Sequence, residues 1–592
     1  MFFIWMKREK KYLLDEKQLI EYTECNIYIR RVCMKETKKQ NIWFLAGLLG
    51  IGLILFWRCF YSVNTTDEAY YIGTVYRLWF GDGMLCDEWN PTQQMCSFWL
   101  YPFYAIFRLI LGSNEGMILA FRLLYVVFQL GISVYLYGRL KKFGNGCFFA
   151  IFFYLLSTAF NINSLSYNTM ANSCLAALLV TLATMETVEW KSCVWSGIFA
   201  SIVVMANPYA VFAYVLYGII CVVTTIILQK RKVQIPTAIR FQIFFRISLT
   251  AAGVLAVFLL FTFWHATLER IVKNLPYIVG DQEHVQRWNV KISDYFRYFR
   301  EHYLGAVIVP LTASGIALLD KKRIKHGFVY MIVSVLAVTP YIIYHGLISN
   351  YVPINLVTVP ICFLGFTAYV VSEKKLGKVF YVWYLPAMIY PFIVQITSNT
   401  GPLAVSAGFV TAGAAAVLLT LAWAKEQKSK LCKYGLYIVV ILQLLIMLFL
   451  RITYVWADAP MSELHTKVER GAAKGLYTTE ASVQFYEEIY DDIDALNIQE
   501  DEGFLVIGSA PLLYLYADRE VASYSTWQVF TNETRLYRYY EIHDGEGKFP
   551  DVIYCLEADD TIFESILVDK LLIPMGYEWE QLQHGIAFYT ER

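Results

Sequence analysis

The sequence predicts a polytopic α-helical membrane protein that ends in a small α/β domain outside the membrane. Of its 592 residues 57% are hydrophobic and 17% are charged, whereas about a quarter of the residues of a soluble protein are charged. The apolar residues form runs long enough to cross a bilayer, and the composition changes abruptly after residue 451. The formal net charge of +1 indicates no nucleic-acid partner.

Thirteen mostly apolar segments are predicted to span the membrane as helices and to form a membrane domain over residues 42–451. They lie near 42–61, 118–138, 146–164, 169–186, 193–207, 210–228, 246–266, 304–319, 327–345, 351–371, 379–397, 402–424 and 434–451. The apolar run 98–111 contains Arg108, and we expect it to lie in the membrane interface or to re-enter the membrane. A fourteenth span at this point would invert every later loop.

The positions of lysine and arginine predict the orientation of these spans. Cationic clusters such as Arg139, Lys141 and Lys142 fall in alternate connections, and the short turns on the other side contain no Lys or Arg. Because short cationic loops stay in the cytoplasm, the N-terminal segment 1–41 is predicted to be cytoplasmic. This segment does not resemble a signal peptide, and translation starts either at Met1 or at Met34. An odd number of spans places the C-terminal segment outside.

Three regions are therefore expected outside the membrane: the loops 62–117 and 267–303 and the segment 452–592. The last of these contains helix-like stretches at 480–496 and near 559–569. Strand-like stretches lie at 504–508, 552–554 and 586–589. This alternation predicts a small extracytoplasmic α/β domain.

The adjacent carboxylates Asp67 and Glu68 follow the first span and precede a loop rich in aromatic residues, beginning with Tyr70 and Tyr71. An aromatic surrounding removes water from a carboxylate and raises its pKa, which suits a general base. A solvated cap at the end of a span is the alternative interpretation.

Several short motifs, in order, resemble the N-terminal half of the GT-C glycosyltransferases. Within that group they are most similar to bacterial relatives of the lipid A aminoarabinose transferases and the protein O-mannosyltransferases. The motifs are Asp67-Glu68-Ala69-Tyr70-Tyr71, Tyr101-Pro102, Ala120-Phe121-Arg122-Leu123-Leu124, Tyr135-Leu136-Tyr137-Gly138-Arg139-Leu140 and Tyr154-Leu155-Leu156-Ser157. Asn350-Tyr351-Val352-Pro353 resembles a later family segment, in which an arginine is usual at the first position.

This resemblance implies a membrane transferase that moves a sugar from a polyprenyl phosphate to a glycan, lipid or protein acceptor at the outer face, usually with inversion at the sugar carbon. Asp67 matches the family's catalytic base, and Glu68 is expected to orient the acceptor or to assist Asp67. Tyr70, Tyr71 and Tyr351 are expected to bind substrate, although Tyr351 could equally anchor the chain at the interface. The sequence names neither the sugar nor the acceptor.

The donor phosphate requires cations at the height of the lipid headgroups. Arg122 matches a family arginine and is predicted to contact this phosphate, with simple snorkelling as the alternative. Arg270 and Lys273, in the loop 267–303, are further candidates, and the alternative for each is a solvated loop charge.

No cofactor is assigned from the sequence. The histidines show no HxxxH or HExxH spacing, and no GxxxxGK[ST] motif for nucleotide phosphates is present. A divalent ion (Mg or Mn) held by Asp67 and Glu68 is compatible with the sequence, but two adjacent carboxylates are too few to assign a metal site. Asn168 also stands where many relatives carry an aspartate.

Two other classes of function compete with the transferase. A transporter or flippase for lipid-linked sugars would also bind a polyprenyl phosphate, and such proteins usually contain repeated halves, which this sequence lacks. An inactive binding or scaffold protein is the third class, because function lies in a site and not in a fold.

Overall fold

The computed structural model describes residues 39–230, 236–279, 287–349, 351–373, 376–397, 401–532, 534–558 and 560–590. Nearly all of the predicted cytoplasmic segment 1–41 and also Asn350 lie outside these ranges. The chain divides into two compact units, 1–53 and 54–592, and the site residues described below all lie in the second unit.

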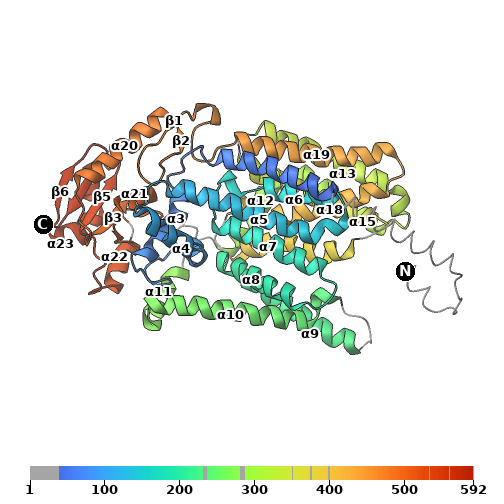
Figure 1. Ribbon diagram of the computed structural model, residues 1–592, viewed down its shortest axis with the longest axis horizontal. Coiled ribbons are helices and arrows are strands. Elements are labelled where there is room, and N and C mark those ends of the chain that lie inside the picture. Colours follow the sequence, from blue (N-terminus) through green and yellow to red (C-terminus); the bar gives the residue numbers. More distant parts are fainter. Residues whose placement is uncertain are drawn as a thin grey trace, which may run out of the picture. The chain divides into compact units, whose positions relative to one another are not determined.

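Most of the described chain is helical, as a polytopic membrane protein requires (Figure 1). Nine of its described helices are long and apolar enough to cross a membrane. They are Lys39–Arg58, Met117–Phe143, Ala210–Lys230, Phe241–His265, Asn289–Leu319, Arg323–Leu347, Pro353–Val371, Pro402–Glu426 and Lys430–Thr453. Three shorter apolar helices, Gly146–Leu156, Trp190–Ala206 and Val379–Gln395, and the helix Tyr167–Thr184 cover the other predicted spans.

In the labels of Figure 1 the membrane helices that follow Lys39–Arg58 run from α5 to α19 along the chain. Their bounds are α5 (Met117–Leu140), α6 (Gly146–Leu156), α7 (Tyr167–Thr184), α8 (Trp190–Ala206), α9 (Ala210–Lys230), α10 (Phe241–His265), α12 (Trp288–Leu319), α13 (Arg323–Leu347), α14 (Pro353–Leu356), α15 (Val359–Val371), α16 (Leu385–Thr397), α17 (Pro402–Ser406), α18 (Val410–Glu426) and α19 (Lys430–Thr453).

Two helix boundaries differ clearly from the sequence prediction. Helix α6 ends at Leu156, well before the predicted end at residue 164, and the chain then turns through Phe160 and Asn161, which both have positive φ. The predicted loop 267–303 is largely helical, because α11 (Leu268–Val279) and the first turns of α12 occupy it. The first turns of α12 contain charged residues such as Arg297 and Arg300, so they do not form part of an apolar run.

Small residues let the central membrane helices approach each other closely. A Cβ atom added to Gly365 of α15 would lie 2.3 Å from Cβ of Ala416 in α18. The ring of Phe153 in α6 covers Gly413 of α18 in a similar way. Such contacts replace the hydrophobic effect, which does not drive helix association in lipid.

Two helices follow the first membrane helix, in the loop 62–117 that the sequence predicts to lie outside the membrane. Helix α3 (Asp67–Trp79) begins at the predicted base, and α4 (Pro91–Leu111) covers the apolar run 98–111. Arg108 of α4 pairs with Asp518 of the C-terminal segment, with 2.8 Å between Nη1 and Oδ2. This ion pair attaches α4 to the C-terminal segment, which agrees with the prediction that residues 98–111 do not span the membrane.

The C-terminal segment forms the predicted α/β domain. Its main sheet has the order β4 (Glu520–Val521), β3 (Gly503–Ile507), β5 (Val552–Leu556), β7 (Gly585–Tyr589) and β6 (Glu578–Gln581). Strand β3 is parallel to β4 and β5, and β7 is antiparallel to β5 and β6. The strands β1 (Thr466–Lys467) and β2 (Tyr477–Thr478) form a second, antiparallel pair. The helices of the domain are α20 (Glu480–Ala495), α21 (Pro511–Ala517), α22 (Thr534–Ile542) and α23 (Ile573–Met575).

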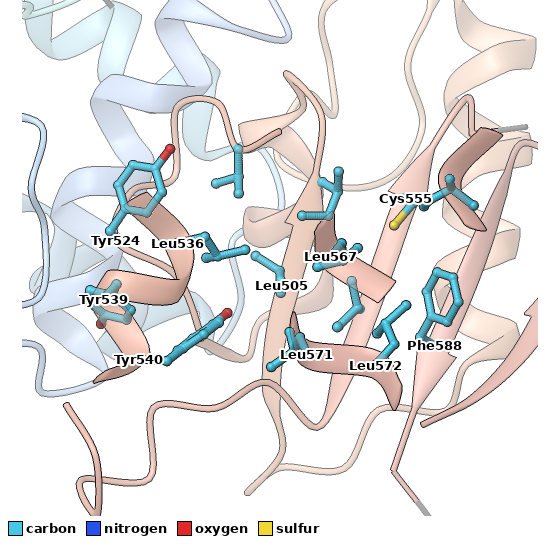
Figure 2. Close-up of a cluster of buried hydrophobic side chains, with 14 of the residues drawn as sticks. Leu505, Tyr524, Leu536, Tyr539, Tyr540, Cys555, Leu567, Leu571, Leu572 and Phe588 are labelled. Carbon is cyan, nitrogen blue, oxygen red and sulfur yellow. The ribbon is translucent and has the colours of Figure 1, made fainter. Parts of the chain in front are cut away.

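The core of this domain includes residues from both outer loops. Figure 2 shows Leu505, Leu536 and Phe588 among its buried side chains. Trp89 of the first loop and Ile278 of α11 belong to the same buried cluster. The Trp89 indole donates to Oδ1 of Asn274 at 2.7 Å, and its backbone N–H donates to the Tyr524 carbonyl. The two outer loops and the C-terminal domain therefore share one hydrophobic core.

Candidate functional site

Asp67 is the first residue of α3, and a short polar turn fixes its position. The Asn64 side-chain oxygen accepts hydrogen bonds from the backbone N–H and the hydroxyl of Thr66, at 3.1 and 3.2 Å. This turn starts the helix at a defined residue. A carboxylate in the first turn also interacts favourably with the helix dipole.

Trp456 holds one oxygen of Asp67, a contact that no sequence pattern indicates. The indole Nε1 donates to Oδ2 of Asp67 at 3.0 Å, across 389 positions of sequence. The chain beside Trp456 is held in place by Asp458. This carboxylate accepts hydrogen bonds from the Val63 backbone N–H at 2.8 Å and from the Thr478 hydroxyl. The beginning of the C-terminal segment thus orients the predicted base.

Aromatic side chains lie close to Asp67, but only Tyr70 and Tyr71 among them come from the first loop, on whose composition the prediction rested. We call this group the aromatic cluster; it consists of Tyr70, Tyr71, Phe160, Ile162, Tyr167, Trp456 and Trp527. The Phe160 and Trp456 rings lie 4.9 Å apart, and the Tyr70 and Trp527 rings lie 5.2 Å apart. Both predicted substrate tyrosines, Tyr70 and Tyr71, are buried within this cluster.

Burial within the aromatic cluster raises the pKa of Asp67. The hydrogen bond from Trp456 favours the charged form and offsets part of this effect, whereas the neighbouring negative charge of Glu68 adds to it. Asp67 remains half-buried, so part of its side chain is accessible. The result is a carboxylate that is more basic than an ordinary aspartate.

Glu68 and Arg122 form a fully buried, two-pronged ion pair. Arg122 Nε and Nη2 lie 2.8 and 2.6 Å from the two carboxylate oxygens of Glu68. The remaining N–H groups of Arg122 donate to the carbonyls of Cys59, Tyr61 and Ser62. The structure therefore brings the two predicted residues together, and in this arrangement the guanidinium donates only to protein atoms.

The other two predicted phosphate ligands lie on α11 and contact the C-terminal domain. Arg270 Nη2 is 2.9 Å from Oδ1 of Asp87 and 2.8 Å from Oε2 of Glu546. Lys273 Nζ donates to the Ile542 carbonyl at 2.6 Å. Both side chains thus connect α11 to the outer domain.

Among the described residues, one group of side chains could hold a metal ion, but it does not include Asp67. Asp87, His543 and Glu546 each offer a ligand atom, and these atoms lie within 4.8 Å of one another. Arg270 already bridges the two carboxylates of this group and offsets part of their negative charge. Near Asp67, Glu68 commits both oxygens to Arg122, and the acidic pair therefore does not offer two free carboxylates to a divalent ion.

The predicted substrate residue Tyr351 lies among aromatic residues of α12 and α13. Its ring stacks on His302 with 4.7 Å between centroids and an angle of 2° between the planes. The side chain is 44% exposed and is available to a ligand or to lipid. Its role in substrate binding stays a prediction.

Two further arginines near Asp67 escaped the sequence analysis. Arg58 ends the first membrane helix, and Arg451 lies in the last turn of α19. Each stands at the end of an apolar run, where a cation normally indicates only the edge of a span. A more specific signal would have been that both spans end on the same predicted outer side.

Comparison with known proteins finds similarity at the level of structure only. No protein-family model and no curated protein matches the sequence. ArnT from Cupriavidus metallidurans, solved with undecaprenyl phosphate, is 14% identical with a TM-score of 0.38, and the match covers 92% of this chain and 97% of ArnT.

Two structures of the oligosaccharyltransferase from Archaeoglobus fulgidus also match. AglB, solved with an inhibitory peptide and a dolichol-phosphate, is 10% identical, and the enzyme tethered to an acceptor peptide is 11% identical. Each match covers 93% of this chain and 74% of the other, with a TM-score of 0.38. These values transfer neither substrate nor catalytic residues to this chain.

Proposed function

We propose that this protein is a membrane glycosyltransferase that moves a sugar from a polyprenyl phosphate to an acceptor, with Asp67 as the general base. The observation that carries the proposal is the half-buried Asp67 carboxylate, oriented by Trp456 and made more basic by the aromatic cluster. The reaction requires a group that takes the proton of the acceptor hydroxyl as the sugar carbon is attacked. The leaving phosphate needs no acid, because it departs as a stable anion.

The lipid part of the donor fits an apolar groove along α12. The groove has a volume of about 730 Å³, and its lining is apolar except for Lys291, Arg300 and Gln395. The apolar lining includes Tyr295, Phe296, Phe299, Leu304 and Ile308. The lining residues of α12 extend from 291 to 311, a length of about 30 Å along a helix, which equals the thickness of the hydrocarbon core. Such a groove suits a long isoprenoid chain.

Arg122 takes a positioning role in this proposal. Its ion pair with Glu68, the residue next to Asp67, fixes the start of α3 and so the place of the base. We propose further that the site faces the outside of the membrane, with the C-terminal domain on the acceptor side. The cationic connections predicted to be cytoplasmic support this orientation.

The test is sugar transfer by the purified protein supplied with polyprenyl-phosphate sugars, comparing the parent with Asp67→Asn. We expect the substitution to lower kcat by about 10²- to 10⁴-fold, the usual contribution of a general base, with little change in KM. Asp544→Asn, an exposed carboxylate of the outer domain, is the matched control and should leave transfer unchanged.

Two results would contradict the proposal. Unchanged transfer by Asp67→Asn would reject Asp67 as the base. Absence of transfer by the parent with every donor, combined with movement of lipid-linked sugar across vesicle membranes, would favour the transporter class instead. Mass spectrometry of cell-surface glycans from a deletion strain would identify the product.

A further inference from the structure

Three buried arginines meet beside the predicted base. Arg58, Arg122 and Arg451 come from the first membrane helix, α5 and α19, and their side chains are 2%, 3% and 0% exposed. Arg58 and Arg122 line one small cavity with Glu68, Asn163 and Trp456. The cavity has room for about one water molecule. Because Trp456 donates to Asp67, this cavity adjoins the proposed catalytic carboxylate.

Among the described residues, only Arg122 of these three arginines forms an ion pair with a carboxylate. Glu68 neutralises Arg122 through the two-pronged pair described above. Arg58 donates to the carbonyls of Tyr61 and Tyr454, at 2.7 and 3.3 Å. Arg451 donates to the Asn161 side-chain oxygen and to the Tyr125 hydroxyl. Within the described ranges neither guanidinium forms an ion pair with a carboxylate, and Nε of each has no hydrogen-bond partner.

A buried guanidinium without a carboxylate partner, such as that of Arg58 or Arg451, is unfavourable unless an anion accompanies it. Removing a charged group from water costs several kcal/mol, and neutral carbonyl partners offset only part of this penalty. Both arginines end their helices, where the helix dipole supplies a partial negative charge but not a full one. A negative charge bound beside Arg58 and Arg451 would offset part of this cost.

We propose that Arg58 and Arg451 form an anion site that receives an oxygen of a phosphate group. Under the proposed function, on which the identity of this phosphate rests, it is the phosphate of the donor. The acceptor hydroxyl oxygen forms the new bond to the sugar carbon and gives its proton to Asp67. The bond between that carbon and the phosphate oxygen breaks, and its electron pair stays on the phosphate, whose negative charge grows by one. Arg58 and Arg451 stabilise this developing charge.

Binding of a lipid phosphate that carries no sugar tests this site separately from transfer. Purified full-length protein in nanodiscs is titrated with undecaprenyl phosphate, with undecaprenol, which has the same tail without the phosphate, and with inorganic phosphate. Arg58→Gln removes the charge and keeps a polar side chain of similar reach. Arg538→Gln is the matched control, because Arg538 is an exposed arginine of the outer domain.

We expect Arg58→Gln to weaken undecaprenyl phosphate binding at least tenfold and to leave undecaprenol binding unchanged. Arg538→Gln should bind both lipids as the parent does. If inorganic phosphate binds with the same dependence on Arg58, the anion site stands and its ligand is free phosphate. Equal binding of undecaprenyl phosphate by the parent and Arg58→Gln would overturn the proposal.

Further variants separate anion binding from a purely structural role. Arg451→Gln should weaken binding in the same way, and Arg58→Lys, which retains the charge, should recover part of the affinity. If Arg58 only supports the helix ends, Arg58→Gln and Arg58→Lys will lower thermal stability without changing the affinity ratio between phosphorylated and neutral lipid. Binding that depends on Arg58 in a protein that transfers no sugar would keep the anion site and reject the transferase. If Arg58→Gln still transfers sugar and binds undecaprenyl phosphate as the parent does, the transferase is kept and the anion site is rejected.

Discussion

At the level of single residues, ionisation of Asp67 links catalysis to stability. Its pKa is raised chiefly by burial, so the ionised form is less stable in the folded protein than in the unfolded chain. The stability that Asp67 contributes is therefore present below its unfolded pKa and is lost as the pH rises through its higher folded pKa. A general base needs the ionised form, so activity and stability should change in opposite directions with pH.

We therefore expect transfer activity to fall as the pH decreases through the raised pKa of Asp67. A plot of log(kcat/KM) against pH should show an acid limb with its midpoint above the range of an ordinary aspartate. Steady-state rates measured across the acidic range check this. A midpoint at or below the ordinary value would show that the ionisation of another group controls the rate.

The same reasoning predicts that Asp67→Asn stabilises the protein. The amide cannot ionise, so at neutral pH the variant should be more stable than the parent by on the order of 1 kcal/mol. Below the ordinary pKa of an aspartate, where the parent carboxyl is protonated in both the folded and the unfolded state, the difference should disappear. Thermal unfolding in detergent at the two pH values measures it, with Asp544→Asn as the control. A variant less stable than the parent at neutral pH would contradict the effect of burial on this carboxyl group.

Glu68 should matter for stability because it neutralises buried Arg122. Glu68→Gln leaves the guanidinium without its counter-charge and should lower the free energy of unfolding by about 3–5 kcal/mol. Glu115→Gln breaks an exposed pair with Lys474 and should change stability by less than about 1 kcal/mol. Denaturant unfolding of the two variants compares them directly. Equal, small changes would show that the Glu68–Arg122 pair contributes little.

At the level of helices and strands, the sequence predicted which segments are regular better than it predicted their ends. Apolar runs identified the membrane helices, and short strand-like stretches identified β3, β5 and β7. Helix α12 begins far earlier than predicted, because its outer turns carry charged and aromatic residues that no hydropathy pattern distinguishes from a loop. The early end of α6 depends on the positive φ angles of Phe160 and Asn161, which the local sequence does not predict.

Close packing between α15 and α18 should make Gly365 sensitive to the addition of one methyl group. In Gly365→Ala the new Cβ would meet Ala416 at 2.3 Å, so the two helices would have to separate. We expect a loss of about 1–3 kcal/mol. Gly253→Ala in α10 is the matched control, because a Cβ atom added there would have no atom within 4 Å and alanine favours helix. Thermal unfolding should separate the two variants, and equal melting temperatures would contradict this packing.

At the level of the whole molecule, the outer loops and the C-terminal domain should unfold together because they share a core. Trp89→Ala removes a buried indole of the first loop from that core and should cost about 3–5 kcal/mol. It should also increase proteolysis of the C-terminal domain, although Trp89 lies far from that domain in sequence. Limited proteolysis with mass spectrometry identifies the sites that are cut.

Trp579→Ala, at an exposed position on β6, is the control for this prediction and should leave the cleavage pattern unchanged. Protection of the C-terminal domain in Trp89→Ala equal to that in the parent would show that the domain is stable without the first loop. Removal of residues 461–592 is a poorer test of acceptor binding than point substitutions, since it would expose the shared core.

Local sequence was sufficient to predict the membrane helices and the α/β character of the C-terminal domain. These features depend on composition and short periodic patterns, which a chain carries locally. The contacts that orient Asp67 through Trp456, pair Arg122 with Glu68 and bring Arg58 and Arg451 beside them emerge only in the folded protein. Such contacts join residues up to several hundred positions apart, and their geometry arises from the packing of helices that a local pattern does not encode.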